Sequence, residues 1–352
     1  MDFSYKFPAV RGKQAGKEYY IAMVPLKLLG RIFGNDEEYV PPEFRAQRRL
    51  NTARIPIIKE YILDNRDSYV FSAIAASIDG EYRFTSYGNS ELGILEVSMD
   101  ARFMIVDGQH RKASIIEAIA EDDTLKEETI SIVLYEDKGL EHSQQMFTDL
   151  NKHAVKTSNS ISELYDSRDE LAVITRRVVN SIPFLDQYTD KEKDILGKYS
   201  SNFFTLNTFY KANKKIIGRN ACDNRSEQFL KVFWQNIAQH IVPWNDLVKK
   251  EISKVDLREQ YIITQAIIIQ AFGVLGSYFY SHDIEIEKLV DLEKVNWLRN
   301  AECWRDRVVR ANGKIINNTD AAKLACNVIK RIIGIALDPE EQKLEEGFLG
   351  EK

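Results

Sequence analysis

The stretch Phe103–Ile116, with the sequence FMIVDGQHRKASII, decides the fold of the first part of the chain. Its four apolar residues predict a buried strand, Asp107-Gly108 predicts a tight turn, and the residues that follow predict a helix. A glycine at such a bend lets the backbone approach a ligand, and the first amides of the helix favour an anion. Because the cations Arg111 and Lys112 oppose the helix dipole, we expect a bound anion, with phosphate as the natural candidate. The alternative is an ordinary turn with solvated basic side chains.

On both sides of this stretch, the N-terminal half of the chain mixes short β-rich runs with helical segments. Periodicity predicts a helix over 51–63, and a hairpin or strand pair from 71–78 and 82–84 around Asp79-Gly80. Further strands are expected at 19–24, 94–97, 102–106 and 130–135, and a helix over 114–119. This mixture is typical of an α+β domain.

The second half of the chain has helical periodicity, over 163–179, 226–241, 252–280 and 319–337. We therefore predict two domains, an α+β domain over 1–142 and a mostly helical domain over 143–352 that ends in a polar, frayed tail. Residues 260–280 are nearly continuously apolar. This predicts a buried central helix, with a partner-binding helix as the alternative.

Composition narrows the class of protein. The chain has 352 residues and a formal net charge of −5, which disfavours coating of nucleic acid through bulk charge but leaves a local basic face open. No apolar stretch is long enough for a membrane span, and the N-terminus has no apolar signal-peptide core. Cys222, Cys303 and Cys326 form no CxxC pair, so we expect no zinc site or disulfide framework and a reducing cytoplasm.

Two windows of the sequence are basic and contain no acidic residue. The first window, 45–59, offers as candidate DNA-binding residues Arg45, Arg48, Arg49 and Arg54. The second window, 198–219, offers Lys198, Lys211, Lys214, Lys215 and Arg219, interleaved with Tyr199, Phe203, Phe204, Phe209 and Tyr210. Basic side chains contact phosphates and exposed rings stack on bases, whereas a solvated basic face over buried rings is the alternative. A smaller basic cluster consists of Arg305, Arg307, Arg310 and Lys314.

The five letters DGQHR at 107–111 resemble the signature of the DGQHR-domain family, and the whole chain looks like a DNA sulfur-modification protein of the DndB type. The resemblance extends to QRRLN at 47–51 with Arg54-Ile55-Pro56, to MFTDLNKHA at 146–154, and to the segment 297–315. More distantly, the chain resembles the ParB/sulfiredoxin-like fold. In that fold a Gly-x-x-Arg turn binds nucleotide phosphates, and Gly108 to Arg111 has this spacing.

The resemblance implies roles for single residues. The ParB/sulfiredoxin-like pocket is completed by an Asn on a later helix, for which Asn151 is the candidate, and the missing Cys in the turn implies that the redox chemistry is absent. Asp107 is expected to fix the turn or cap the helix, and Gly108 to supply the backbone conformation. Gln109 and His110 are expected to present polar edges to the ligand, and Arg111 to clamp its phosphate. The candidate cofactor is a nucleotide, ATP or CTP, with Mg.

The function implied by the resemblance is that of a cytoplasmic DNA-binding regulator that represses the genes of a phosphorothioate modification system. Its partners would be double-stranded promoter DNA and other modification proteins, with no membrane, and the sequence leaves a homo-oligomer open. The alternative is an accessory protein that binds or hydrolyses a nucleotide at the DGQHR turn. Asp107, His110 and Asp149 would form a metal or hydrolytic site only if the fold brought them together. Because no HExxH, Walker A or nucleophile-elbow motif is present, we expect a binding protein rather than an enzyme.

Overall fold

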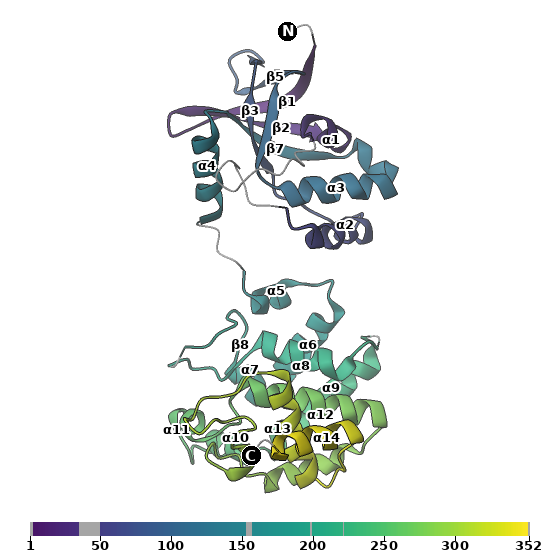
Figure 1. Ribbon diagram of the computed structural model, residues 1–352, viewed down its shortest axis with the longest axis vertical. Coiled ribbons are helices and arrows are strands. Elements are labelled where there is room, and N and C mark those ends of the chain that lie inside the picture. Colours follow the sequence, from purple (N-terminus) through teal and green to yellow (C-terminus); the bar gives the residue numbers. More distant parts are fainter. Residues whose placement is uncertain (1–2, 35–49, 153–156, 198, 221, 351–352) are drawn as a thin grey trace. The chain divides into compact units, whose positions relative to one another are not determined.

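The computed structural model describes residues 3–34, 50–152, 157–197, 199–220 and 222–350 of the chain. Two compact units, Met1–Val155 and Lys156–Lys352, each have a hydrophobic core of their own. The first unit holds a sheet and helices and the second is mostly helical, which confirms the predicted α+β class (Figure 1). The boundary expected after residue 142 falls inside helix α4 (Leu140–Lys152), whereas the contacts divide the chain after Val155.

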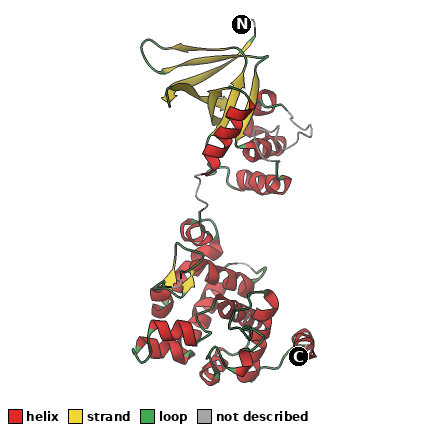
Figure 2. Ribbon diagram, turned by 60° about the vertical axis from the view of Figure 1, so that its left-hand side comes forward, coloured by secondary structure: helices red, strands yellow, loops and turns green. Residues whose placement is uncertain are grey.

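A seven-stranded sheet forms the centre of the first unit (Figure 2). Its strands are β1 (Ser4–Gln14), β2 (Lys17–Pro25), β3 (Ile74–Asp79), β4 (Tyr82–Ser86), β5 (Leu92–Ser98), β6 (Arg102–Asp107) and β7 (Thr129–Glu136). They lie in the order β4-β5-β1-β2-β7-β3-β6. Every neighbouring pair is antiparallel except β3 and β7, which run parallel. The sheet is therefore mixed.

Helices cover the sheet of the first unit. They are α1 (Leu29–Ile32), α2 (Ile55–Asp64), α3 (Gln109–Glu121) and α4. Figure 1 shows α1, α2 and α3 together on one side of the sheet and α4 on the other. Alternate residues of the strands point to the first side, and Tyr20, Ala22 and Val24 of β2 are buried there. Val106, next to the end of β6, is fully buried, and β6 contacts α4.

The predicted pairing of 71–78 with 82–84 is wrong. Strand β3 pairs with β6 and β7, and among the strands of the described residues β4 pairs only with β5. Five successive residues of β3 are buried, so this strand needs a neighbour on each side and cover on both faces. Strand β4 has exposed and half-buried residues throughout and forms an edge of the sheet.

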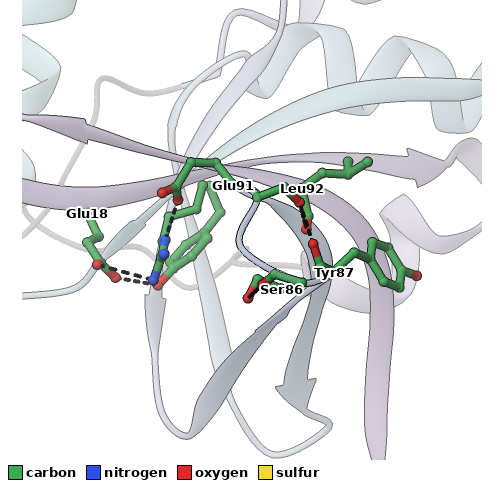
Figure 3. A network of polar contacts seen from close by, with 9 residues as sticks. Glu18, Ser86, Tyr87, Glu91 and Leu92 are labelled. Atoms are coloured by element: carbon green, nitrogen blue, oxygen red, sulfur yellow. Dashed lines mark hydrogen bonds and ion pairs between the residues drawn. The ribbon is translucent and has the colours of Figure 1, made fainter.

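A charged network links the strands near that edge (Figure 3). The guanidinium of Arg11 lies 2.7 Å from Glu91 Oε2 and 3.5 Å from Glu18 Oε1. The hydrogen bond from Arg11 holds the pKa of Glu91 below its ordinary value. The amide of Tyr87 donates to the Leu92 carbonyl at 2.8 Å and closes the turn between β4 and β5. The ion pairs of Arg11 thus link β1 to β2 and to the residue that precedes β5.

The second unit is built from helices. They are α5 (Asn159–Tyr165), α6 (Glu170–Ser181), α7 (Pro183–Tyr188), α8 (Leu206–Ile217), α9 (Asn224–His240), α10 (Val242–Val248), α11 (Lys254–Gln260), α12 (Ala266–His282), α13 (Thr319–Ile332) and α14 (Pro339–Gly350), with the short strands β8 (Thr189–Asp190) and β9 (Phe204–Thr205). Helix α12 is the predicted buried helix. A Cβ added to its Gly273 would lie 3.0 Å from Ala212 Cα, so the glycine lets α8 pack closely against it.

Several helices of the second unit begin or end differently from the prediction. The helix expected over 163–179 is divided because Asp169 caps α6 by accepting from the Ala172 amide at 2.9 Å. The helix expected over 252–280 is divided because the backbone at 260–262 pairs with the segment at 297–299: the Ile262 amide donates to Trp297 O and the Arg299 amide to Gln260 O.

The C-terminal segment forms a helix, so the predicted frayed tail is wrong. Glu345 of α14 is only 1% exposed, and its Oε1 lies 2.5 Å from Arg307 Nη1. Lys330 of α13 is fully buried and donates to Glu341 at 2.5 Å. These charges are matched inside the protein and hold α14 in place. Of the helices formed by the described residues, none is both long and apolar enough to cross a membrane.

Candidate functional site

The predicted strand–turn–helix lies between β6 and α3 and is confirmed. Strand β6 ends at Asp107, α3 begins at Gln109, and Gly108 between them has φ 105° and ψ 13°. Residues with a Cβ rarely adopt this conformation. A Cβ here would also lie 3.0 Å from Ile74 Cγ1 and 3.0 Å from Arg111 Nη2. The turn therefore requires glycine both for its conformation and for the space around it.

The arginine of the signature is engaged with the protein itself. Arg111 Nη2 lies 2.5 Å from Asp107 Oδ2, and Nη1 donates to the carbonyl and the hydroxyl of Ser72. The Arg111 side chain is only 16% exposed. Helix α3 has no side-chain cap, so of the two roles expected for Asp107 the structure has the first: Asp107 fixes the turn through its ion pair with Arg111. Whether Arg111 also clamps a phosphate stays a prediction.

His110 joins two segments of the first unit. Its side chain is buried, and its Nε2 accepts a hydrogen bond from the Asn51 amide at 3.0 Å. One turn further along α3, Ser114 Oγ donates to the Ile55 carbonyl at 3.1 Å. The two bonds hold the start of α2 against α3, so Nε2 of His110 is used inside the protein rather than as a polar edge for a ligand.

A cavity of about 220 Å³, here called the turn cavity, opens beside the signature. Its lining includes all six residues that the sequence assigns to ligand binding: Asp107, Gly108, Gln109, His110, Arg111 and Asn151. Arg54, Ile58, Val106 and Phe147 complete it. Helix α4 thus brings Asn151 to the turn, as the resemblance implies. Asp149 does not line the cavity and accepts a hydrogen bond from Gln145 at 2.7 Å, so the hydrolytic trio is not assembled there.

Arg54 lines the turn cavity, a position that the sequence did not predict for it. It belongs to the first basic window, but the structure places it in the lining of the turn cavity. The residue is exposed, and its guanidinium forms no ion pair with any carboxylate of the described residues. Arg45, Arg48, Arg49 and Lys198, which are also predicted to bind DNA, lie outside the described residues.

Comparison with known proteins identifies the family. Residues 7–336 match the family DndB, described as DNA-sulfur modification-associated. The chain belongs to the DndB family. This confirms the expected DndB-type family and associates the chain with DNA sulfur modification. No curated protein and no solved structure matches the chain, and the resemblance to the ParB/sulfiredoxin-like fold stays a prediction.

The second basic window of this DndB-family chain lies mainly on α8. Lys211, Lys214 and Arg219 are exposed, and Lys215 is half-buried. Of the five interleaved rings, three are buried in the core of the second unit: Phe203, Phe204 and Phe209. Stacking of these three rings on bases is therefore ruled out, because the core of the second unit covers them.

A hollow of about 380 Å³, here called the lysine hollow, lies where α8, α12 and α13 meet. Lys215 and Lys323 line it together with polar side chains from Ser277, Ser281, His282 and Thr319. Burial, and then the positive charge of Lys323, lower the pKa of Lys215. Neither ammonium forms an ion pair within the part of the chain that the structure describes. Sequence reasoning missed Lys323 because only the packing of α13 brings it to α8.

Lys211 lies in a different environment, beside the buried carboxyl of Glu163. The Asn207 amide joins the two groups: its nitrogen donates to Glu163 Oε1 at 3.0 Å and its oxygen accepts from Lys211 Nζ at 3.3 Å. Burial, and then the nearby negative charge of Asp194, raise the pKa of Glu163 to about 7. Lys211 is therefore tied to this carboxyl.

The smaller basic cluster is divided by the structure. Arg307 is buried against Glu345 and serves the packing of α14, so it takes no part in a basic face. Arg305, Arg310 and Lys314 are exposed.

Proposed function

We propose that this DndB-family protein is a DNA-binding regulator that represses transcription of the modification genes. The observation that carries the proposal is the pair Lys215 and Lys323, two cations that line one hollow without a carboxylate partner among the described residues. Two positive charges that repel each other favour an anionic guest, and a DNA phosphate supplies one.

The surroundings of the pair fit the phosphate backbone. Ser277, Ser281 and Thr319 bring hydroxyl groups to the same hollow, and Thr319 is the first residue of α13. Phosphate contacts in protein–DNA complexes come from Lys, from Ser and Thr, and from helix N-termini. Lys214 on the same helix as Lys215, and Arg219 just beyond its end, are exposed and extend the basic surface. The lysine hollow is therefore a phosphate-contacting surface.

The test compares two DNA duplexes of equal length at one stated salt concentration: the promoter of the protein's own gene cluster and a random sequence. We expect tighter binding to the promoter and repression in a transcription assay. Lys215→Ala/Lys323→Ala should weaken promoter binding about tenfold. Each lost contact between a lysine and a phosphate should reduce the binding free energy by about 1 kcal/mol or less. The matched control is Lys191→Ala/Lys294→Ala, which removes two lysines that already have carboxylate partners. Equal affinity for both duplexes would contradict the regulator proposal.

A second candidate function, nucleotide binding at the turn cavity, is favoured by the convergence of Gly108, Asn151 and Arg54 on one cavity. With Arg111 engaged by Asp107, Arg54 is the residue that would contact the phosphate. Calorimetry with ATP, CTP and GTP, each with magnesium, tests this candidate. Arg54→Ala should abolish binding and the exposed Arg31→Ala should preserve it. Binding without turnover would indicate a ligand-gated regulator, and turnover would indicate a nucleotide hydrolase.

A further inference from the structure

A second arginine-bearing cavity, of about 650 Å³, lies in the second unit and is here called the arginine pocket. Its lining includes three arginines, Arg299, Arg305 and Arg310, which come from the segment between α12 and α13. The volume is within the range of about 300–1,000 Å³ that small-molecule sites occupy. All of its lining residues lie in the second unit, so it is separate from the turn cavity.

The walls of the arginine pocket are fixed by backbone hydrogen bonds. The Arg299 amide donates to the Gln260 carbonyl at 2.7 Å, which joins the segment 297–299 to the end of α11. The Arg310 amide donates to the Lys314 carbonyl at 2.9 Å, and the Gly313 amide donates to the Arg310 carbonyl at 2.8 Å. Val309 forms isolated bridges with Arg305 and Ile315. The three arginines are therefore positioned by the backbone before a ligand arrives, which lowers the entropic cost of binding.

The charges of the arginine pocket are poorly matched within the protein. Arg299 Nε is buried and has no hydrogen-bond partner among the described residues. The ion pairs of Arg305 are long, 3.8 Å to Glu302 and 3.9 Å to Asp306. Arg310 is exposed and forms no ion pair with a carboxylate of the described chain. A buried N–H donor without a partner is costly, and a bound acceptor would satisfy it.

The remaining lining indicates what the anion carries. Leu298, Ala301, Val309 and Ala311 supply an apolar surface of the kind on which a base can pack. Asn300 brings an amide that can pair with a base edge, and Glu259 brings a carboxylate of the kind that accepts hydrogen bonds from ribose hydroxyls. We propose that the arginine pocket binds a nucleoside phosphate, with the arginines on the phosphate. Both a free nucleotide and the end of a nucleic acid strand present this group.

The experiment uses full-length protein and three probes in calorimetry: inorganic phosphate, ATP, and a short single-stranded oligonucleotide with a 5′-phosphate. The test variant is Arg305→Ala/Arg310→Ala, which removes two exposed side chains and leaves the backbone pairing in place. The control is Lys294→Ala/Lys314→Ala, which removes the same charge from the same unit outside the pocket. Arg54→Ala removes a residue of the turn cavity and so distinguishes binding at the arginine pocket from binding at the turn cavity.

We expect ATP or the oligonucleotide to bind, with affinity lowered at least about tenfold in Arg305→Ala/Arg310→Ala and unchanged in the control and in Arg54→Ala. Tighter binding of ATP identifies a free nucleotide as the source, and tighter binding of the oligonucleotide identifies a strand end. Three results would overturn the proposal: binding of none of the probes, an equal loss in the lysine control, or a loss in Arg54→Ala alone. The proposal is independent of DNA binding at the lysine hollow, which these variants leave intact.

Discussion

The turn cavity and the arginine pocket both contain arginines, but Arg111 of the turn cavity and the arginines of the pocket have opposite surroundings. In the turn cavity, both terminal nitrogens of Arg111 are bonded to Asp107 and Ser72. In the arginine pocket, Arg299 Nε has no partner among the described residues and the ion pairs of Arg305 are long. The difference shows that the arginine of a signature motif can stabilise a turn, whereas the charges available to a ligand belong to arginines outside the motif.

Of the substitutions that test this comparison, Gly108→Val should cause the largest loss of stability. The substitution combines a strained positive φ with contacts 3.0 Å from Ile74 and Arg111, so we expect the first unit to lose about 3 kcal/mol of unfolding free energy. Gly139→Val is the matched control, because Gly139 has φ 94° and open space around it. It should cost about 1 kcal/mol. Equal losses would show that strain alone, and not the closeness of Arg111, matters at the turn.

The two units can be observed separately in such unfolding experiments. All four tryptophans lie in the second unit, at 234, 244, 297 and 304. Tryptophan fluorescence therefore reports on the second unit, whereas far-UV circular dichroism follows both. Gly108→Val should shift the circular dichroism transition and leave the fluorescence transition unchanged.

The next prediction compares the arginines directly. Arg111→Ala should lower the stability of the first unit by about 2 kcal/mol, because it leaves Asp107 and Ser72 without their charged partner. Arg310→Ala should change the stability of the second unit by about 0.5 kcal/mol or less, since its side chain is exposed. Urea denaturation followed by both signals measures the two effects. A urea unfolding curve of Arg111→Ala like that of the unmodified protein would contradict the structural role of Arg111 in the turn.

The buried carboxyl of Glu163, which Lys211 reaches only through the Asn207 amide, adds a prediction on pH dependence. Glu163 has a pKa of about 7 in the folded state, above the ordinary value for glutamate, and its Oε2 has no hydrogen-bond partner among the described residues. The folded state therefore binds a proton that the unfolded state has already released, so this group's contribution to stability falls as pH rises from about 4.5 through about 7.

Glu163→Gln should remove this pH dependence and stabilise the second unit relative to the unmodified protein by about 1–2 kcal/mol near pH 8. The glutamine oxygen can still accept the hydrogen bond from Asn207. Fluorescence-detected urea unfolding at several pH values measures the difference, with the exposed Glu251→Gln as control. Parallel stability–pH curves for Glu163→Gln and the unmodified protein would contradict the assignment.

The elements with strong periodicity could be predicted from the sequence. Strand β6, Gly108 and helix α3 follow from FMIVDGQHRKASII, and the buried α12 follows from its apolar run. Strand pairing could not be predicted, because the burial of β3 on both faces depends on distant partners. The ordered C-terminal helix could not be predicted either, since its buried and half-buried acidic residues find their partners, Arg307, Lys330 and Arg331, on other elements.

The candidate site could be predicted in its residue types but not in its ion pairs. The sequence places Asp107, Arg111 and Asn151 together through the resemblance, and the structure gathers them at one cavity. The sequence does not show that Asp107 neutralises Arg111, or that Lys323 lies close to Lys215. Those facts depend on three-dimensional contacts, and they decide which charges are available to a ligand.

The central claim, that the lysine hollow contacts DNA phosphates, is tested most directly by the salt dependence of promoter binding. Each phosphate contact contributes about 0.9 to the slope of log K against log salt concentration. Lys215→Ala/Lys323→Ala should therefore flatten the slope by about two relative to the unmodified protein. Lys191→Ala/Lys294→Ala should leave the slope unchanged, because both lysines already have carboxylate partners. An unchanged slope in Lys215→Ala/Lys323→Ala would contradict the claim.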